Sequence, residues 1–237
     1  MSLLLILAFL FSIGAVGGWV LELLYRRFLS DANPERKWIN PGFCTGPYLP
    51  LYGFGLCLLY LIAQLQTIFH GIHNSALFLV MAVSMTVIEY IAGIWTLKRS
   101  NVRLWDYSNE WGNVRGIICP KFSVYWAILG AVYYFFIHPH ILNALLWLSH
   151  NLAFSFFIGM FFGVFVLDFA HSVQFIAKLR SFALENHVVV RYEAVKLHIR
   201  TQQEKAKQKY HFFCPFHSEK ALRESLREML LSLETKK

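Results

Sequence analysis

The stretch Trp105-Asp106-Tyr107-Ser108-Asn109-Glu110-Trp111-Gly112-Asn113-Val114-Arg115-Gly116 is a polar and aromatic segment between two long apolar runs. Glu89 lies sixteen residues before Trp105, and Glu22 lies sixteen residues before Trp38. A proline follows each tryptophan, and a tyrosine follows that proline by five residues, as in Pro47 to Tyr52 and Pro120 to Tyr125. One helix-loop-helix pattern is therefore written twice, and it predicts two similar hairpins.

The composition of the chain points to a membrane protein. Of its 237 residues, 57% are apolar and only 15% are charged, whereas about a quarter of the residues of a soluble domain are charged. The spacing of the cysteines is irregular and contains no CxxC pair, which predicts neither a disulfide framework nor a zinc site; they are Cys44, Cys57, Cys119 and Cys214. We therefore expect no metal and no other cofactor.

Five apolar runs are long enough to cross a bilayer, for which about 20 helical residues suffice. They cover about residues 3–25, 48–69, 75–97, 117–137 and 151–175, with short turns expected at 70–74 and 138–150. The first run lacks a signal-peptide cleavage site and is expected to be retained. The second begins among Pro47, Pro50 and Gly53, so irregular backbone is expected where it starts. The predicted fold class is an all-α polytopic membrane helix bundle with five transmembrane helices.

The basic residues of the short connections predict the orientation of the bundle. They lie after the first span (Arg26, Arg27, Arg36, Lys37) and after the third (Lys98, Arg99, Arg103, Arg115), while 70–74 and 138–150 contain none. The N-terminus is thus expected outside and the C-terminus inside, with both long loops cytoplasmic. Both hairpins then start outside, which makes them parallel repeats.

The predicted division of the chain is a transmembrane bundle over 1–177 and a basic cytoplasmic helical tail over 178–237. From Ala177 to Lys237 there are 13 Lys/Arg against 7 Asp/Glu. A basic tail behind an apolar body favours contact with anionic membrane lipid over nucleic acid. Residues 219–234 have the apolar periodicity of an amphipathic helix, and the string His211, Cys214, His217 offers too few ligands to predict a metal site.

Three carboxylates, those of Glu22, Glu89 and Asp168, are expected in the inner half of the bilayer. An ionised carboxylate near the bilayer centre costs at least about 2.5–3.5 kcal/mol, which suggests shared use. We hypothesise an acidic cluster below a vestibule that opens to the cytoplasm and is roofed by the two loops. Gly14 and Gly18 share a helix face with Glu22, so a neighbouring helix should approach closely there. The alternative is that Glu22 and Asp168 cap helix ends at the headgroup level.

The same residues carry a family resemblance. The chain resembles the family described as "Putative ABC-transporter type IV", the CmpB-like membrane proteins, over roughly residues 10–175, through Glu22, Asn40-Pro41-Gly42-Phe43, Gly46-Pro47-Tyr48-Leu49-Pro50-Leu51-Tyr52-Gly53-Phe54-Gly55, Glu89-Tyr90, Trp105-Asp106-Tyr107-Ser108, Asn113 and Gly116-Ile117-Ile118-Cys119. The resemblance implies a permease-type component of a bacterial plasma (inner) membrane. The chain has no Gly-rich loop ending in Gly-Lys-Ser/Thr, so ATP hydrolysis would require a separate ATP-binding subunit.

Two classes of function stay open at this point. In a transporter, Glu89 would bind a cation or a cationic solute together with Glu22 and Asp168, behind a polar and aromatic mouth. In a membrane-embedded enzyme acting on a lipid headgroup or small amphiphile, Glu89 and Asp106 would serve as acid and base. The absence of a nucleophile paired with a base, and of an HExxH helix, favours a non-enzymatic function. The candidate binding residues are Glu22, Glu89, Asp168, Asp106, Asn40, Asn113, Trp105, Tyr107, Tyr52 and Tyr125.

Overall fold

The computed structural model describes residues 1–30, 33, 36–42, 44–68, 74–186 and 188–199. Within them the chain is mostly helical, with elements in the order α1 (Leu3–Phe28), α2 (Pro50–Ile68), α3 (Asn74–Ser100), β1 (Val102–Arg103), α4 (Pro120–Val132), the π-helix η1 (Tyr133–Ile137), α5 (His138–His150), the 3-10 helix η2 (Leu152–Phe154), α6 (Ser155–Glu185) and β2 (Val190–Arg191). A further helical stretch covers 192–199. The expected amphipathic helix at 219–234 and the string His211, Cys214, His217 lie outside the described residues.

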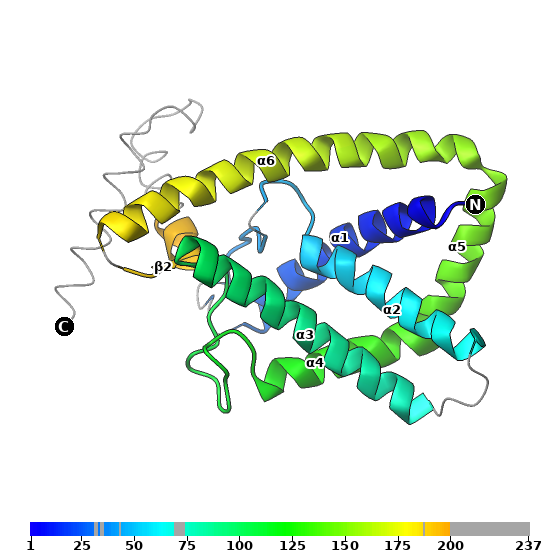
Figure 1. The fold of residues 1–237 in the computed structure, drawn as a ribbon, viewed down its shortest axis with the longest axis horizontal. Helices are drawn as coiled ribbons and strands as arrows, with labels where there is room; N and C mark the ends of the chain where they lie inside the picture. The colour runs from blue at the N-terminus through cyan, green and yellow to red at the C-terminus, as the bar shows by residue number, and fades with distance from the viewer. Residues whose placement is uncertain (31–32, 34–35, 43, 69–73, 187, 200–237) are drawn as a thin grey trace.

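Two helical hairpins form the body of the molecule, because α1 packs against α2 and α3 packs against α4 (Figure 1). The close approach expected at the first pair of glycines is present. A Cβ on Gly18 would lie 2.2 Å from Cβ of Tyr52, and a Cβ on Gly14 would lie 2.8 Å from the carbonyl oxygen of the same tyrosine. Glycine is therefore required at Gly18 for α2 to reach α1.

In the part of the chain that the structure describes, four helices are long and apolar enough to cross a membrane, namely Leu3–Phe28, Asn74–Ser100, Pro120–His150 and Leu152–Glu185. The expected second span is present as a shorter apolar helix, Pro50–Leu65. Its start is irregular, as Pro47 and Pro50 predict, because the helix begins only at Pro50. The structure thus supports a membrane protein, and the count of five crossings stays a prediction.

The turn expected at 138–150 is wrong, because these residues form α5. Pro139 was the reason to expect a break, since proline removes a helical hydrogen bond in a helix interior. Here Pro139 lies directly after the π-helix η1, and a helix with a proline or a π-helical turn bends instead of ending. The π-helix η1 joins α4 to α5, and the chain changes direction there without leaving helical conformation (Figure 1).

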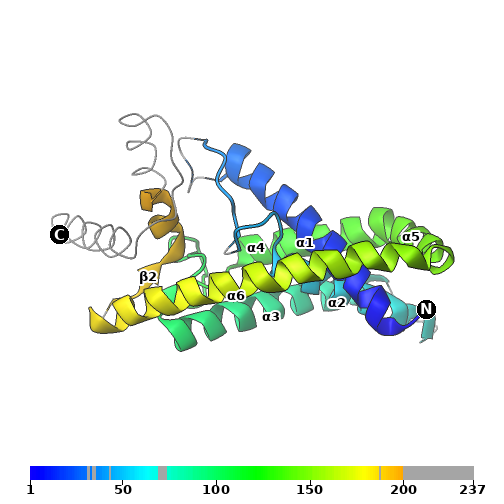
Figure 2. The same cartoon turned by 90° about the horizontal axis from the view of Figure 1, so that it is seen from above.

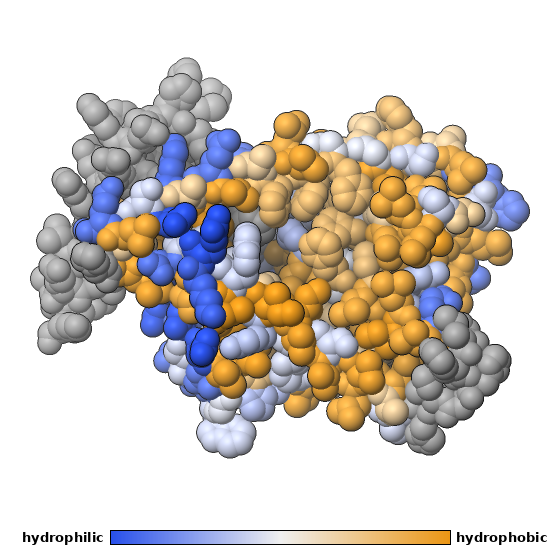
Figure 3. Space-filling view, in the orientation of Figure 1, coloured by the Kyte–Doolittle hydropathy of each residue, from blue (hydrophilic) through white to orange (hydrophobic). Residues whose placement is uncertain are grey.

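The polar loops gather at one end of the molecule, which we call the polar end and define by the described residues 29–30, 33, 36–42, 44–47, 101–119 and 188–199. The N-terminus and α5 lie at the opposite end, and α6 runs the length of the molecule between the two ends (Figures 1 and 2). A band of hydrophilic residues separates the apolar body from the polar end (Figure 3). Helix α6 continues past residue 177, and the chain then returns at 188–199 to pack on the loops.

Candidate functional site

Glu89 is the buried centre of the candidate site. It lies in α3, and only 2% of its surface is exposed. The hydroxyl of Tyr107 donates a hydrogen bond to one carboxylate oxygen at 3.0 Å, and Nε1 of Trp126 donates to the other at 2.9 Å. Both donors are neutral, and no lysine, arginine or histidine of the described chain forms an ion pair with Glu89. Its carboxylate is therefore hydrogen-bonded but not neutralised.

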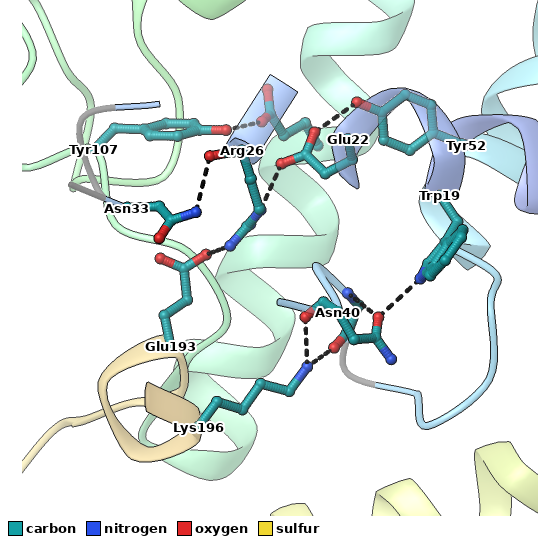
Figure 4. Close-up of polar contacts among 11 residues, drawn as sticks. Trp19, Glu22, Arg26, Asn33, Asn40, Tyr52, Tyr107, Glu193 and Lys196 are labelled. Carbon is teal, nitrogen blue, oxygen red and sulfur yellow. Dashed lines mark hydrogen bonds and ion pairs between the residues drawn. The ribbon is translucent and has the colours of Figure 1, made fainter. Parts of the chain in front are cut away.

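Glu22 lies on α1 and is held in a different way. Nε of Arg26 lies 2.9 Å from Oε1 of Glu22, and the hydroxyl of Tyr52 donates to Oε2 at 3.0 Å. Arg26 also pairs through Nη1 with Glu193 at 2.5 Å. Figure 4 shows the guanidinium between these two carboxylates, one from the body and one from the returning segment. A single cation is thus shared by two acidic groups.

The charges of both carboxylates, Glu22 and Glu89, act on the hydroxyl of Tyr107. Burial raises the pKa of the Tyr107 hydroxyl well above its usual value, and the charges of Glu89 and then of Glu22 raise it further. The Tyr107 ring stacks on Phe122 with centroids 4.2 Å apart. Tyr52 packs against Trp126 with centroids 5.2 Å apart. Aromatic side chains of α2, α4 and the second loop therefore surround the pair of carboxylates.

Each carboxylate accepts a hydrogen bond from the returning helix of its own hairpin. Tyr52 of α2 donates to Glu22 of α1, and Trp126 of α4 donates to Glu89 of α3. The sequence pattern places Tyr125 where Tyr52 stands, but Tyr125 contacts the rings of Phe122 and Tyr25 and Trp126 makes the bond. The second donor therefore lies one residue beyond the position that the sequence pattern indicates, and the internal repeat stays a prediction.

Asp106 organises the second loop and is paired with cations. Its Oδ1 lies 3.0 Å from Nη1 of Arg103 and accepts bonds from the hydroxyl and the backbone N–H of Ser108, while Oδ2 lies 2.9 Å from Nε of Arg191. Burial alone would raise the pKa of Asp106, but the bonds from Ser108 and the charges of Arg191 and Arg103 hold that pKa below its ordinary value. A carboxylate held as an anion in this way is a poor base, and the geometry gives the enzymatic alternative no support.

Asn113 and Trp105 shape the same loop. The side-chain amide of Asn113 donates to the carbonyl oxygens of Ser108 and Glu110, and its oxygen accepts from the N–H of Gly116. Nε1 of Trp105 donates to the carbonyl oxygen of Ile117 at 2.8 Å, and its ring lies over Gly93 of α3. Both residues hold Tyr107 in place and do not reach the carboxylates themselves.

Asp168 does not join the other two carboxylates. It projects from α6 to the irregular chain before α2, where it accepts bonds from the N–H of Thr45 at 3.2 Å, the N–H of Gly46 at 2.8 Å and the hydroxyl of Tyr48 at 2.5 Å. Ser172 adds a fourth donor at 3.5 Å. Asp168 thus satisfies backbone N–H groups of the chain before α2. It lies within α6, so it caps no helix end. Its partners among the described residues differ from those of Glu22 and Glu89, and the expected acidic site stays a prediction for those two carboxylates.

Asn40 holds the first loop in a comparable way. Its Oδ1 accepts from Nε1 of Trp19 and from the N–H of Gly42, and its Nδ2 donates to the carbonyl oxygens of Cys44 and Thr45. Of the predicted binding residues, the structure brings Tyr52 to Glu22 and Tyr107 to Glu89; sequence reasoning missed Trp126 and Arg26. The position of Arg26 four residues after Glu22 is a helical ion-pair spacing that could have predicted that contact. Among the described residues, no group of three or more His, Cys, Asp or Glu side chains could hold a metal ion.

The family model described as "Putative ABC-transporter type IV" matches residues 9–173 of the chain. This range contains both hairpins apart from the first six residues of α1, and it includes both loops and Asp168. No curated protein matches the chain, and no solved structure matches it.

Proposed function

The chain belongs to the Putative ABC-transporter type IV family, and on that premise we propose that it is a permease-like transporter component whose Glu22–Glu89 pair binds a cation. The cation is a proton or a small cationic solute. The residues that would hold it are the two carboxylates, with Tyr52, Tyr107 and Trp126 as the surrounding aromatic donors.

The observation that carries the proposal is the uncompensated charge of Glu89. An ionised carboxylate taken out of water costs several kcal/mol unless a cation or a proton compensates it, and in a membrane such a residue is a functional candidate by default. The described neighbours of Glu89 supply hydrogen bonds but no positive charge. A bound cation would complete this arrangement.

The charge balance of the neighbourhood supports one monovalent ligand. Three carboxylates, those of Glu22, Glu89 and Glu193, stand against Arg26 and Lys196, which interact with Glu193 and with each other. Counting each group as ionised, three negative charges and two positive charges leave one negative charge. One proton or one monovalent cation neutralises it.

The polar end is the cytoplasmic end in this proposal. The basic residues that follow α1 and α3 lie there, as the positive-inside rule requires of cytoplasmic loops. The chain would then cross the plasma membrane five times, with its N-terminus outside, its two parallel hairpins opening inward and its basic tail in the cytoplasm. A thiol probe that does not cross membranes should label N109C only from the inside and S75C only from the outside; labelling from one side at both positions contradicts this orientation.

The proposed site is tested by cation binding to the purified protein. Sodium, potassium and methylammonium chloride are titrated while tryptophan emission is followed, because Trp126 donates directly to Glu89. We expect saturable binding of at least one of these ions to the wild type and loss of binding in E89Q. The matched control is E185Q, which removes an exposed carboxylate of α6. Equal binding by E89Q and the wild type would exclude Glu89 as the site.

Transport itself is tested by uptake of the same cations into proteoliposomes, with and without any ATPase that co-purifies. The chain lacks a phosphate-binding loop, so we propose that a separate ATP-binding subunit drives transport. Uptake that needs neither ATP nor a second subunit would remove the ATPase from this proposal and leave the cation site in place.

A further inference from the structure

The segment 188–199 connects parts of the chain that are distant in sequence. After α6 ends at Glu185, the N–H of Val188 bonds to the carbonyl oxygen of Ala183 at 3.0 Å, and the chain turns back toward the loops. Three separate sets of contacts then attach this segment, which we call the latch, to the rest of the polar end.

The first set attaches the latch to the second loop. Strand β2 pairs in parallel with β1, with Val190 opposite Val102 and Arg191 opposite Arg103. The N–H of Val190 donates to the carbonyl oxygen of Asn101 at 3.0 Å. The ion pair between Arg191 and Asp106 extends this attachment to the centre of the loop. The pairing is only two residues long, so its backbone contribution is small.

The second set attaches the latch to the first hairpin. Glu193 pairs with Arg26 at the end of α1. Lys196 donates to the carbonyl oxygens of Asn40 and Gly42 in the first loop, as Figure 4 shows for Asn40. Burial lowers the pKa of Lys196 to about 8, and the neighbouring charge of Arg26 adds to this effect. A buried ammonium is costly, so this attachment is held at an energetic penalty.

The third set is a small apolar core at the polar end. Tyr192 and Val195 are one helical turn apart and both face inward, where they join Val102, Leu179, Ala183 and Val190. This core is separate from the larger one in the body of the molecule. Elements held by a few buried contacts and by ion pairs are the ones that open locally at low free-energy cost.

We propose that the latch is a releasable cover of the polar end, which joins the two loops when closed and exposes the first loop and the Arg26–Glu22 pair when open. It contacts Arg26 directly, so its release would leave the guanidinium to Glu22 alone. The proposal stands on the contacts of 188–199 and does not require that the carboxylate pair bind a cation.

Backbone amide exchange reports latch opening directly. The N–H of Val190 is bonded to the carbonyl oxygen of Asn101 and Val190 is only 2% exposed, so this amide is expected to exchange with solvent only when the latch leaves the second loop. Hydrogen–deuterium exchange of residues 188–199 is followed by mass spectrometry in the full-length protein. In E193Q and in K196Q we expect exchange of this segment about tenfold faster than in the wild type. R180Q, which removes an exposed basic residue of α6, is the matched control and should leave the rate unchanged.

A disulfide across the two strands tests the proposal in the opposite direction, because it holds the latch closed. It also shows whether faster exchange in the substituted proteins reflects latch opening or misfolding. Val102 and Val190 are direct partners across the strands, so V102C/V190C can be oxidised to hold the latch closed. In a background whose native cysteines are replaced by alanine, we expect residues 188–199 of the oxidised protein to exchange at least about tenfold more slowly than those of the reduced protein. If oxidation leaves the exchange rate unchanged, or if E193Q and K196Q both exchange at the wild-type rate, the latch does not open and the proposal is overturned.

Discussion

Replacement of Glu89 by alanine should lower the stability of the fold, whereas replacement by glutamine should leave it nearly unchanged. Trp126 can only donate a hydrogen bond, whereas the hydroxyl of Tyr107 can donate or accept. In E89Q the amide oxygen can accept from Trp126 while the amide NH2 group donates to Tyr107, so both existing hydrogen bonds keep a partner. In E89A neither donor has one, and both lie next to buried chain.

The magnitude follows from these two contacts. Each buried donor left without a partner costs about 1–3 kcal/mol, with bilayer values toward the lower limit, so E89A should lose about 2–6 kcal/mol of stability. E89Q should stay within about 1 kcal/mol of the wild type. For a chain of this size, 1 kcal/mol corresponds to roughly 2–4 °C in Tm, and E89A should therefore melt at least about 4 °C lower.

The assay is size-exclusion chromatography after heating in a mild detergent, with E185A as the control for loss of an exposed carboxylate. A melting temperature of E89A equal to that of E89Q would refute the hydrogen-bond argument. It would also mean that Glu89 does not contact Tyr107 and Trp126 as described.

Three further predictions concern neighbouring contacts. If the Glu22–Glu89 pair binds a cation, the Arg26 guanidinium competes with that cation for Glu22. E193Q should then weaken cation binding and R26Q should tighten it, each by about fivefold or more. The effect of E193Q should vanish in the R26Q background, and equal effects in both backgrounds would contradict the competition. Burial alone would raise the pKa of Asp106 on folding, but the hydrogen bonds from Ser108 and the charges of Arg191 and Arg103 outweigh it and lower this pKa. The contribution of Asp106 to stability is therefore complete above the ordinary value of 3.8 and is lost as the pH falls through the folded value. D106N should flatten the decline of Tm between about pH 5 and 3, and an unchanged decline would exclude Asp106 as its cause. G18A should cost about 1–3 kcal/mol because its Cβ would collide with Tyr52, whereas G17A, with open space around its Cβ, should be neutral; equal melting temperatures of the two variants would show that α1 and α2 do not touch at Gly18.

The helical body and the contact of Glu22 with a neighbouring helix could be predicted from the sequence, because both depend on the spacing of residues close to one another in the chain. Apolar runs of membrane length predicted the helices, and the spacing of Gly14, Gly18 and Glu22 predicted one helix face in contact with a neighbour. That face meets α2, and Tyr52 reaches Glu22 there. A contact on a helix face that such a local spacing marks is therefore accessible to sequence reasoning.

Other contacts could not be predicted because they depend on helix rotation or on distant segments. Successive residues of a helix differ by about 100° in direction, so a pattern match to Tyr125 could not decide between that residue and Trp126. The contacts of Arg26 with Glu193 and of Asp168 with Gly46 join positions more than a hundred residues apart. No local pattern encodes such a pairing, and strands as short as β1 and β2 leave no periodicity to detect.

Expected depth in the membrane does not distinguish Glu89 from Asp168, whereas the number and kind of hydrogen-bond donors does. Asp168 accepts from two backbone amides and two hydroxyl groups, which is enough to hold a carboxylate as an anion. Its charge is thus used in fixing the chain before α2. From the described residues Glu89 receives two side-chain donors and no cation, so lone pairs of its carboxylate remain available. A buried carboxylate that accepts several backbone and hydroxyl hydrogen bonds stabilises the fold. A buried carboxylate with lone pairs left without a donor is the better candidate for binding a ligand, which is why the proposed site is built on Glu89.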